Sequence, residues 1–151
     1  MFNFDHITML KKINYQFLIS YLGLVPYIYI IIDKYFFSKI TEDIIYNFII
    51  YYSIIILTFI GSINWNLNTK IKNSITIYGF LPSLFAVLII VLNLYEFNKI
   101  LLINALAVFF LLQLVFDYFI IHSPYKSIHI YYLLRLPLTL GIILMLILTI
   151  I

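Results

Sequence analysis

The stretch Leu134-Arg135-Leu136-Pro137-Leu138-Thr139 places a charged side chain and a proline inside an otherwise apolar run that extends from Ile128 to Ile151. A run of this length is sufficient to cross about 30 Å of hydrocarbon as a helix. A charge within such a helix is costly unless it faces the interior of a bundle and finds a partner there. The stretch therefore predicts a membrane span with a counter-charge elsewhere in the chain.

The composition of the whole chain also indicates a membrane protein. Of its 151 residues, 65% are hydrophobic and only 10% are charged, and the mean hydropathy is +1.11. These values lie outside the range of soluble domains. The absence of cysteine excludes disulfides and a thiol nucleophile. The formal charge of +3 is too small and too dispersed for a nucleic-acid surface, so membrane lipids are the expected surroundings.

Five apolar segments are long enough to span a membrane. They are predicted at about residues 14–32, 44–63, 75–95, 100–121 and 128–151. The expected fold is an all-α bundle of five transmembrane helices in a single domain, with Pro26 bending the first helix. The apolar stretch after Lys11 and Lys12 lacks a small-residue cleavage site, so we expect it to be retained as a span.

The distribution of lysine predicts the orientation of the bundle. Five spans place the two termini on opposite sides of the membrane. The side of the N-terminus carries more lysine, whereas the opposite side carries fewer lysines and more acidic residues. This bias predicts an N-terminus on the matrix or cytoplasmic side. Trp65, at the end of the second span, is expected to be an interfacial anchor.

Four pieces of the sequence, in this order, resemble a family of small inner-membrane proteins. They are Tyr21-Leu-Gly-Leu-Val-Pro26, Phe59-Ile-Gly-Ser-Ile-Asn-Trp65, Tyr78-Gly-Phe-Leu-Pro-Ser-Leu84 and Leu133-Leu-Arg-Leu-Pro-Leu-Thr139. The family occurs widely in proteobacteria, and its animal members are the mitochondrial proteins called transmembrane protein sixty-nine. The resemblance implies an inner-membrane location and this topology, and it implies no particular activity. Asn64 stands where the family's second motif has a histidine, so a metal, haem or proton bound by that histidine would be lost here.

The polar residues of the spans are expected to meet in one leaflet. The ends of the second and fourth spans, and the starts of the other three, lie at the same membrane face. Asp117 and Arg135 are then at similar depths, and the guanidinium fork suits a bidentate contact with the carboxylate. The other members of the expected cluster are Gln113, Asn64, Tyr78, Ser83 and Thr139.

Other buried polar groups in the spans also need partners. Pro137 has no amide hydrogen, so the carbonyl of Leu133 loses its helical donor and needs a nearby guanidinium or hydroxyl group. Tyr51 and Tyr52 lie deep in the second span and require hydrogen-bond partners.

Three interpretations of the polar cluster are open. It is a network that fixes helix register and packing, or a pocket for a lipid headgroup, a quinone or a proton, or a contact with a larger complex. No metal or other cofactor is expected. The histidines His6, His122 and His129 lie outside the spans or at their ends, so none is placed to share a haem within the membrane.

The expected function is not enzymatic. Ser62 and Ser83 have no histidine partner within the membrane, and a transporter would be larger and show an internal repeat. We expect a non-catalytic subunit or assembly factor of an energy-transducing complex, the respiratory chain or ATP synthase. The alternative is a standalone binder or carrier of a lipid, quinone or similar amphipathic ligand. A membrane-anchor subunit of a dehydrogenase is a third possibility.

The most abundant amino acids indicate an AT-rich genome. The chain is rich in Ile, Phe, Tyr, Asn and Lys, and contains little Ala or Gly. This bias predicts an inner membrane either of a mitochondrion, with the gene in the organelle, or of a bacterium with such a genome.

Overall fold

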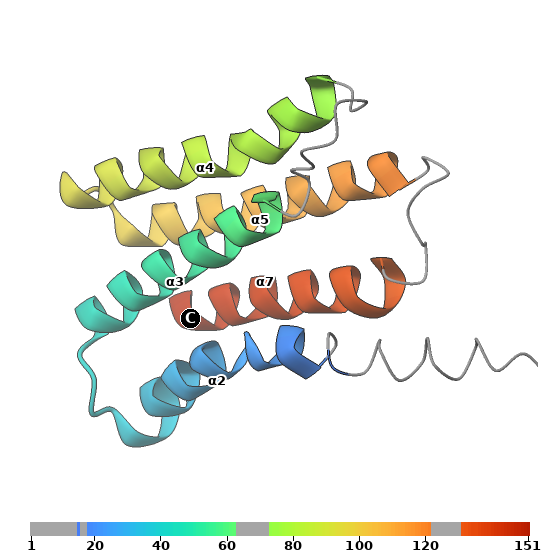
Figure 1. Ribbon diagram of the computed structural model, residues 1–151. Coiled ribbons are helices and arrows are strands. Elements are labelled where there is room, and N and C mark those ends of the chain that lie inside the picture. Colours follow the sequence, from blue (N-terminus) through green and yellow to red (C-terminus); the bar gives the residue numbers. More distant parts are fainter. Residues whose placement is uncertain (1–14, 16–17, 63–72, 122–130) are drawn as a thin grey trace, which may run out of the picture.

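The computed structural model of the chain describes residues 15, 18–62, 73–121 and 131–151, and these are almost entirely helical. The elements are, in chain order, α2 (Val25–Ile32), the π-helical turn η1 (Asp33–Phe37), α3 (Glu42–Ser62), α4 (Asn73–Leu94), α5 (Lys99–Ile121), the π-helical turn η2 (Tyr131–Arg135) and α7 (Leu136–Ile150). Figure 1 shows these helices as a bundle whose last helix, α7, lies between α2 and α5.

Five helices within the described residues are long and apolar enough to cross a membrane. The spans are Leu18–Phe37, Glu42–Ser62, Thr76–Leu94, Lys99–Phe119 and Tyr131–Ile150. At most 39% of the most apolar part of any of these spans is buried inside the bundle, so the outer faces are left to lipid. The predicted all-α, five-span class is confirmed, and the protein is a membrane protein.

The first span differs from the sequence prediction at Pro26. The chain makes a turn at Gly23 and Leu24, and α2 begins directly after it, with Pro26 in its first turn. In that position the missing amide hydrogen of proline is not needed, because the first amides of a helix have no helical acceptor. Pro26 thus begins a new helix and does not bend a continuous one.

The first span also ends later than predicted. We placed its end at Ile32, before Asp33, but helical structure continues through Phe37. Asp33 is only 3% exposed, and its carboxylate accepts a hydrogen bond from the backbone N–H of Ile40 at 2.9 Å. A satisfied acidic side chain does not have to leave the helix for water, so its position does not mark the end of the span.

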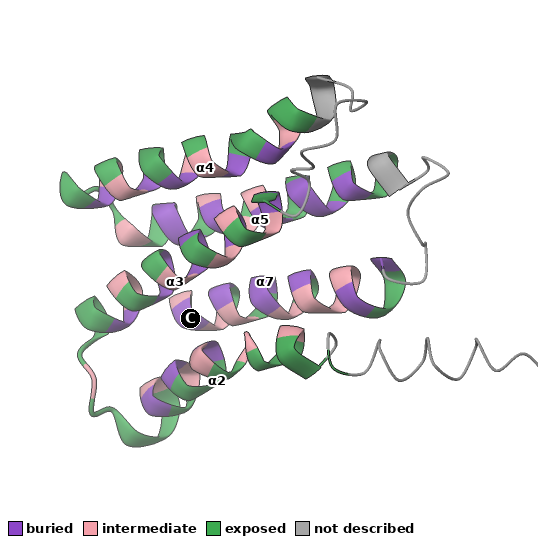
Figure 2. Ribbon diagram, viewed as in Figure 1, coloured by how far each residue is buried: buried purple, intermediate pink, exposed green. Residues whose placement is uncertain are grey.

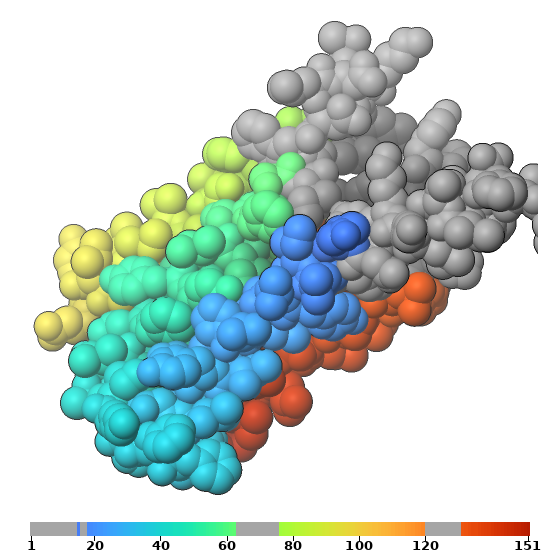
Figure 3. All heavy atoms as spheres, turned by 60° about the horizontal axis from the view of Figure 1, so that its bottom comes forward, coloured from blue at the N-terminus to red at the C-terminus, as the bar shows by residue number. Residues whose placement is uncertain are grey.

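The end of the first span caps α7. The last four carbonyls of a helix have no helical donor. Here the Nζ atom of Lys34 donates to the carbonyl of Thr149 at 2.6 Å, and the hydroxyl of Tyr35 donates to the carbonyl of Leu148 at 2.9 Å. The end of the first span is thereby tied to the end of the last, and Figure 3 shows α2 lying between α3 and α7 on the face turned forward.

The two deep tyrosines of α3 have the partners that the sequence requires. The hydroxyl of Tyr52 donates to the carbonyl of Gly23 at 2.9 Å, and the hydroxyl of Tyr51 accepts a hydrogen bond from the amide of Asn93 at 3.1 Å. A third pair lies between them in the core, where the hydroxyls of Tyr27 and Ser53 are 2.8 Å apart and both residues are fully buried. These bonds join α3 to the first span on one side and to α4 on the other.

The apolar core lies where α3, α5 and α7 meet. Buried residues occupy the facing sides of the helices, and exposed residues occupy the outer sides (Figure 2). The largest fully buried side chains of the core include Ile49, Leu57, Leu106, Phe110 and Leu146.

Helices α4 and α5 are neighbours in sequence but contact each other less than either contacts α3. They separate from the short turn that joins them, as Figure 1 shows. At the other end of α4, α3 approaches very closely: a Cβ atom added to Gly61 would lie 2.7 Å from Cγ of Pro82 and 2.9 Å from the carbonyl oxygen of Gly79. The close α3–α4 crossing leaves space between α4 and α5.

Candidate functional site

An ion pair inside the membrane joins α5 to the turn before α7. The Nε atom of Arg135 lies 2.9 Å from Oδ2 of Asp117, and the two side chains are 17% and 7% exposed. The position of each charge follows from its helix: Asp117 is near the end of α5, and Arg135 closes the π-helical turn η2. The ion pair that the sequence predicts is therefore present, and each charge is compensated where water is scarce.

The ion pair extends to two further helices. The Nη2 atom of Arg135 is 3.4 Å from the carbonyl of Ile60, near the end of α3. Tyr78, near the start of α4, places its hydroxyl 3.1 Å from Oδ1 of Asp117 and 3.0 Å from the carbonyl of Gln113. The predicted bidentate contact is not formed, because the guanidinium uses one nitrogen for the carboxylate and directs another to α3. The arrangement links α3, α4, α5 and η2.

The carbonyl that Pro137 leaves free also has a partner. The hydroxyl of Tyr21, in the first span, donates to the carbonyl of Leu133 at 3.1 Å. The hydroxyl of Tyr131 donates to the carbonyl of Leu114 at 3.1 Å. The sequence predicted a hydroxyl or guanidinium partner for Leu133 without indicating Tyr21, because the distance between two spans cannot be read from spacing along the chain.

Not all of the predicted cluster takes part in this network. Thr139 is buried and Ser83 is partly buried, but among the described residues no hydrogen bond joins either one to the ion pair. The predictions for Asn64 and Trp65 fall on residues outside those that the structure describes. The geometry thus brings together Arg135, Asp117 and Tyr78. Gln113 joins them through its backbone carbonyl, which accepts a hydrogen bond from the Tyr78 hydroxyl.

A pocket of about 480 Å³ lies between α4 and α5, beside the ion pair. Its lining is formed by Leu57, Ile77, Tyr78, Leu81, Pro82, Phe85, Phe109, Leu112, Gln113 and Phe116. None of these residues is charged. Several are exposed on the outer surface of the bundle, so the pocket opens sideways toward the lipid. A volume of this size is within the range of pockets that hold small molecules.

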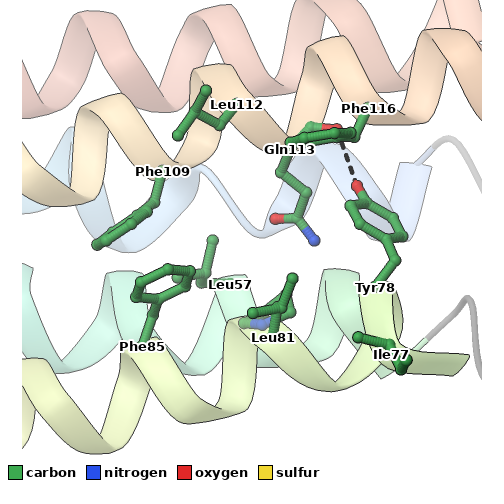
Figure 4. Close-up of a pocket in the computed structure, with 10 residues that line it drawn as sticks. Leu57, Ile77, Tyr78, Leu81, Phe85, Phe109, Leu112, Gln113 and Phe116 are labelled. Atoms are coloured by element: carbon green, nitrogen blue, oxygen red, sulfur yellow. Dashed lines mark hydrogen bonds between the residues drawn. The ribbon is translucent and has the colours of Figure 1, made fainter. Parts of the chain in front are cut away.

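Among the described residues that line this pocket, the amide of Gln113 is the one polar side-chain group besides the Tyr78 hydroxyl. Figure 4 shows it extending from α5 toward α4, next to the ring of Tyr78. The residue is 5% exposed, and among the described residues neither its Nε2 nor its Oε1 atom has a hydrogen-bond partner. A buried amide with both ends unsatisfied is costly, and such groups are rare in folded proteins.

The sequence left a polar pocket open as one interpretation of the cluster, but it did not predict an apolar pocket between α4 and α5. Gln113 was placed in the polar cluster because it lies one helical turn from Asp117, but its amide extends toward α4 into the pocket and makes no hydrogen bond to the ion pair (Figure 4). The pocket depends on the divergence of α4 and α5, which follows from the close crossing at Gly61. The glycine and proline of the motifs Phe59–Trp65 and Tyr78–Leu84 were the available signal, since small residues permit close helix approach.

The described residues of the site offer hydrogen bonds, one ion pair and apolar contacts. Among the described residues there is no group of three or more His, Cys, Asp or Glu side chains that would hold a metal ion. The Tyr78 hydroxyl and the Arg135 guanidinium are each held by hydrogen bonds to other helices. Among the described residues that line the pocket, the unpaired hydrogen-bonding atoms are those of the Gln113 amide.

Comparison with known proteins places the chain in a family. Residues 14–151 match the model of a family described as "Protein of unknown function (DUF3429)". The chain belongs to this family. The matched region includes all five spans and all residues of the site. No curated protein and no solved structure matches the chain.

Proposed function

We propose that this member of the DUF3429 family is a non-catalytic membrane protein that binds an amphipathic molecule, of the lipid or quinone class, in the pocket between α4 and α5. The observation that carries the proposal is the Gln113 amide, which is buried, unpartnered and directed into an apolar pocket that opens to the membrane. A bound molecule with a polar head and an apolar chain would satisfy both parts of this surface.

The energetics of the amide support this proposal. Leaving a buried polar group unpaired costs about 1 to 3 kcal/mol, and the amide of Gln113 has two such atoms. The pocket lining offers no partner apart from Tyr78, whose hydroxyl hydrogen is directed at Asp117 and the carbonyl of Gln113. A group that arrives from outside the chain can supply the missing partners.

The proposed location is the inner membrane of a mitochondrion or of a bacterium with an AT-rich genome. The N-terminus would face the matrix or the cytoplasm. Support comes from the excess of lysine on the N-terminal side and from the amino-acid composition. The resemblance to the mitochondrial proteins called transmembrane protein sixty-nine supports the same location.

Purification in native lipid tests the proposal. The full chain is extracted with a polymer that retains surrounding lipid, and the molecules enriched over bulk lipid are identified by mass spectrometry.

Leu112→Trp would fill the pocket, whereas Leu111→Trp adds the same ring at a neighbouring lipid-facing position that does not line it. The two leucines are 47% and 43% exposed, so the substitutions are closely matched. We expect a retained molecule in the unmodified chain and in Leu111→Trp, and its loss in Leu112→Trp. Equal retention in both variants would contradict the proposal.

A second candidate is a subunit or assembly factor of an energy-transducing inner-membrane complex. It is favoured by the small extent of the described connections: α4 and α5 are joined by a turn at residues 95–98, and the outer helix faces are broadly apolar. A partner would then contact the helices within the membrane. In the same preparation, native electrophoresis would show co-migration with a respiratory complex or ATP synthase if this candidate holds. Migration as a small species with a bound molecule favours the first proposal.

A further inference from the structure

We propose that the head of the bound molecule is uncharged and carries a hydroxyl group that exchanges hydrogen bonds with the Gln113 amide. Its apolar chain would leave the pocket sideways, between α4 and α5, into the lipid. This inference rests on the proposed function and narrows it, because it distinguishes hydroxyl-bearing lipids from phospholipids, esters and oxidised quinones.

The absence of charge among the described lining residues argues for an uncharged head. In the part of the chain that the structure describes, the charges beside the pocket are Asp117 and Arg135, and they are paired with each other at 2.9 Å. The Arg135 guanidinium also reaches Ile60 and not the pocket. A phosphate would therefore enter an apolar space whose described lining offers it no free cation, and the loss of its hydration would not be offset there.

The two free ends of Gln113 argue for a hydroxyl group. The Nε2 atom has hydrogens to donate, and the Oε1 atom has lone pairs to accept. Both atoms are buried and unpartnered. A ketone or ester carbonyl can only accept, so it would satisfy Nε2 and leave Oε1 unpaired. A hydroxyl group accepts from an N–H and donates its own hydrogen, so heads with hydroxyl groups can satisfy both ends.

The position of Tyr78 is consistent with the same head. Its hydroxyl hydrogen lies toward the Asp117 carboxylate and the Gln113 carbonyl, at 3.1 and 3.0 Å. The oxygen keeps a lone pair, so it offers the pocket an acceptor and no donor. A head that only accepts hydrogen bonds would gain nothing from Tyr78, whereas a second hydroxyl group on the head can donate to it.

The shape of the pocket determines the direction in which the apolar chain of the bound molecule leaves it. Ile77 and Phe85 mark its extent along α4, which is about 12 Å at 1.5 Å per residue. At the inner end the rings of Phe85 and Phe109 meet with their centroids 3.9 Å apart, and Figure 4 shows them opposite each other. A long chain cannot continue along the helices past this pair. It must turn outward past Leu81 and Leu112, which are exposed to lipid.

Competition for labelling tests the inference. The full chain in phosphatidylcholine vesicles is labelled with a long-chain alcohol that carries a photoreactive group in its chain, and labelled residues are mapped by mass spectrometry. The competitors are the plain alcohol, its methyl ether and its phosphate, all with the same chain. We expect labelling on α4 and α5, and competition by the alcohol at a concentration about 10-fold lower than by the ether or the phosphate, since 10-fold corresponds to about one hydrogen bond.

The variants test recognition of the hydroxyl head separately from binding of the apolar chain of the ligand. Gln113→Met keeps the length of the side chain and removes the amide, and it should reduce the preference for alcohol over ether to about 1-fold, because one hydrogen-bonding group is lost. Leu112→Trp should abolish labelling, whereas Leu111→Trp should not. A diacylglycerol and a hydroquinone with an isoprenoid chain are then compared as competitors. Competition by either one supports the inference, and the stronger competitor identifies the source of the hydroxyl group.

Two results would overturn the inference while leaving the proposed function intact: equal competition by alcohol, ether and phosphate, or an unchanged alcohol preference in Gln113→Met. The second result would mean that water alone satisfies the amide. Two other results would instead contradict the proposed function itself. One is that the photoreactive alcohol does not label the unmodified protein, and the other is that it labels Leu112→Trp and Leu111→Trp equally.

Discussion

Arg135 and Asp117 meet through one nitrogen and one oxygen, Nε and Oδ2, at 2.9 Å, and not through the whole fork of the guanidinium. Two further hydrogen-bonding groups of the pair contact other helices: Nη2 lies near the carbonyl of Ile60 on α3, and Oδ1 lies near the hydroxyl of Tyr78 on α4. One ion pair therefore fixes the relative positions of four helical elements.

Removing one charge of this pair should destabilise the protein far more than removing both. Arg135→Leu leaves the Asp117 carboxylate buried without its cation, and loss of one partner of a buried pair typically costs about 3 to 5 kcal/mol. The double variant Arg135→Leu with Asp117→Leu leaves no buried charge, so it should recover most of that loss. Reversible unfolding in bicelles measures both. Equal effects in the single and double variants would show that the pair does not act as a unit.

The close crossing of α3 and α4 should not tolerate a methyl group at Gly61. A Cβ atom there would lie 2.7 Å from Pro82 and 2.9 Å from the backbone of Gly79, so Gly61→Ala forces the helices apart, at a cost of about 1 to 3 kcal/mol. Gly141→Ala is the matched control. Its Cβ would meet only Leu24, at 3.4 Å, and alanine is the better helix former, so this variant should be as stable as the original or more so. The temperatures of thermal unfolding of the two variants and the original protein are compared in one detergent.

The sequence predicted much of the fold because the membrane restricts what a chain can do. Apolar length alone determined that there are five spans, and the cost of an isolated charge determined that Arg135 and Asp117 must meet. The predictions that were wrong concern places where a local hydrogen bond or turn determines where a helix begins or ends. Asp33 remains inside a helix because Ile40 donates to it, and Pro26 begins a helix because a turn precedes it.

The sequence indicated the polar network but not the direction of its members. Helical spacing places Gln113 and Asp117 on one face of α5, yet the Asp117 carboxylate meets Arg135 while the Gln113 amide points into the space beside α4. Which way a side chain turns depends on the separation of the neighbouring helices. That separation is determined by contacts such as Gly61 with Pro82, between residues far apart in the chain.

The hydroxyl pair in the core should show strong coupling. Tyr27 and Ser53 are fully buried and their oxygens are 2.8 Å apart, so Tyr27→Phe or Ser53→Ala alone leaves the other hydroxyl unpaired. Each single variant should lose about 1 to 2 kcal/mol of unfolding free energy, and the double variant should lose less than the sum. A double-mutant cycle in bicelles measures the coupling. Strictly additive losses would contradict a direct hydrogen bond between the two side chains.

Gln113 should lower the stability of the protein when the pocket is empty. Its two amide atoms are buried without partners, so Gln113→Met removes an unpaired polar group and should raise the unfolding free energy of the protein stripped of bound molecules by about 1 kcal/mol or more. The amide of Asn93 provides a partial contrast: its oxygen has no partner among the described residues, but its nitrogen donates to Asn47 and Tyr51, so Asn93→Leu removes two hydrogen bonds and should destabilise. Unfolding is measured with and without added long-chain alcohol. The alcohol should stabilise the unmodified protein and have less effect on Gln113→Met, because ligand stabilisation follows affinity for the folded state. A stripped Gln113→Met protein that is less stable than the original would mean that the amide has a structural partner, and its role as a free binding group would have to be abandoned.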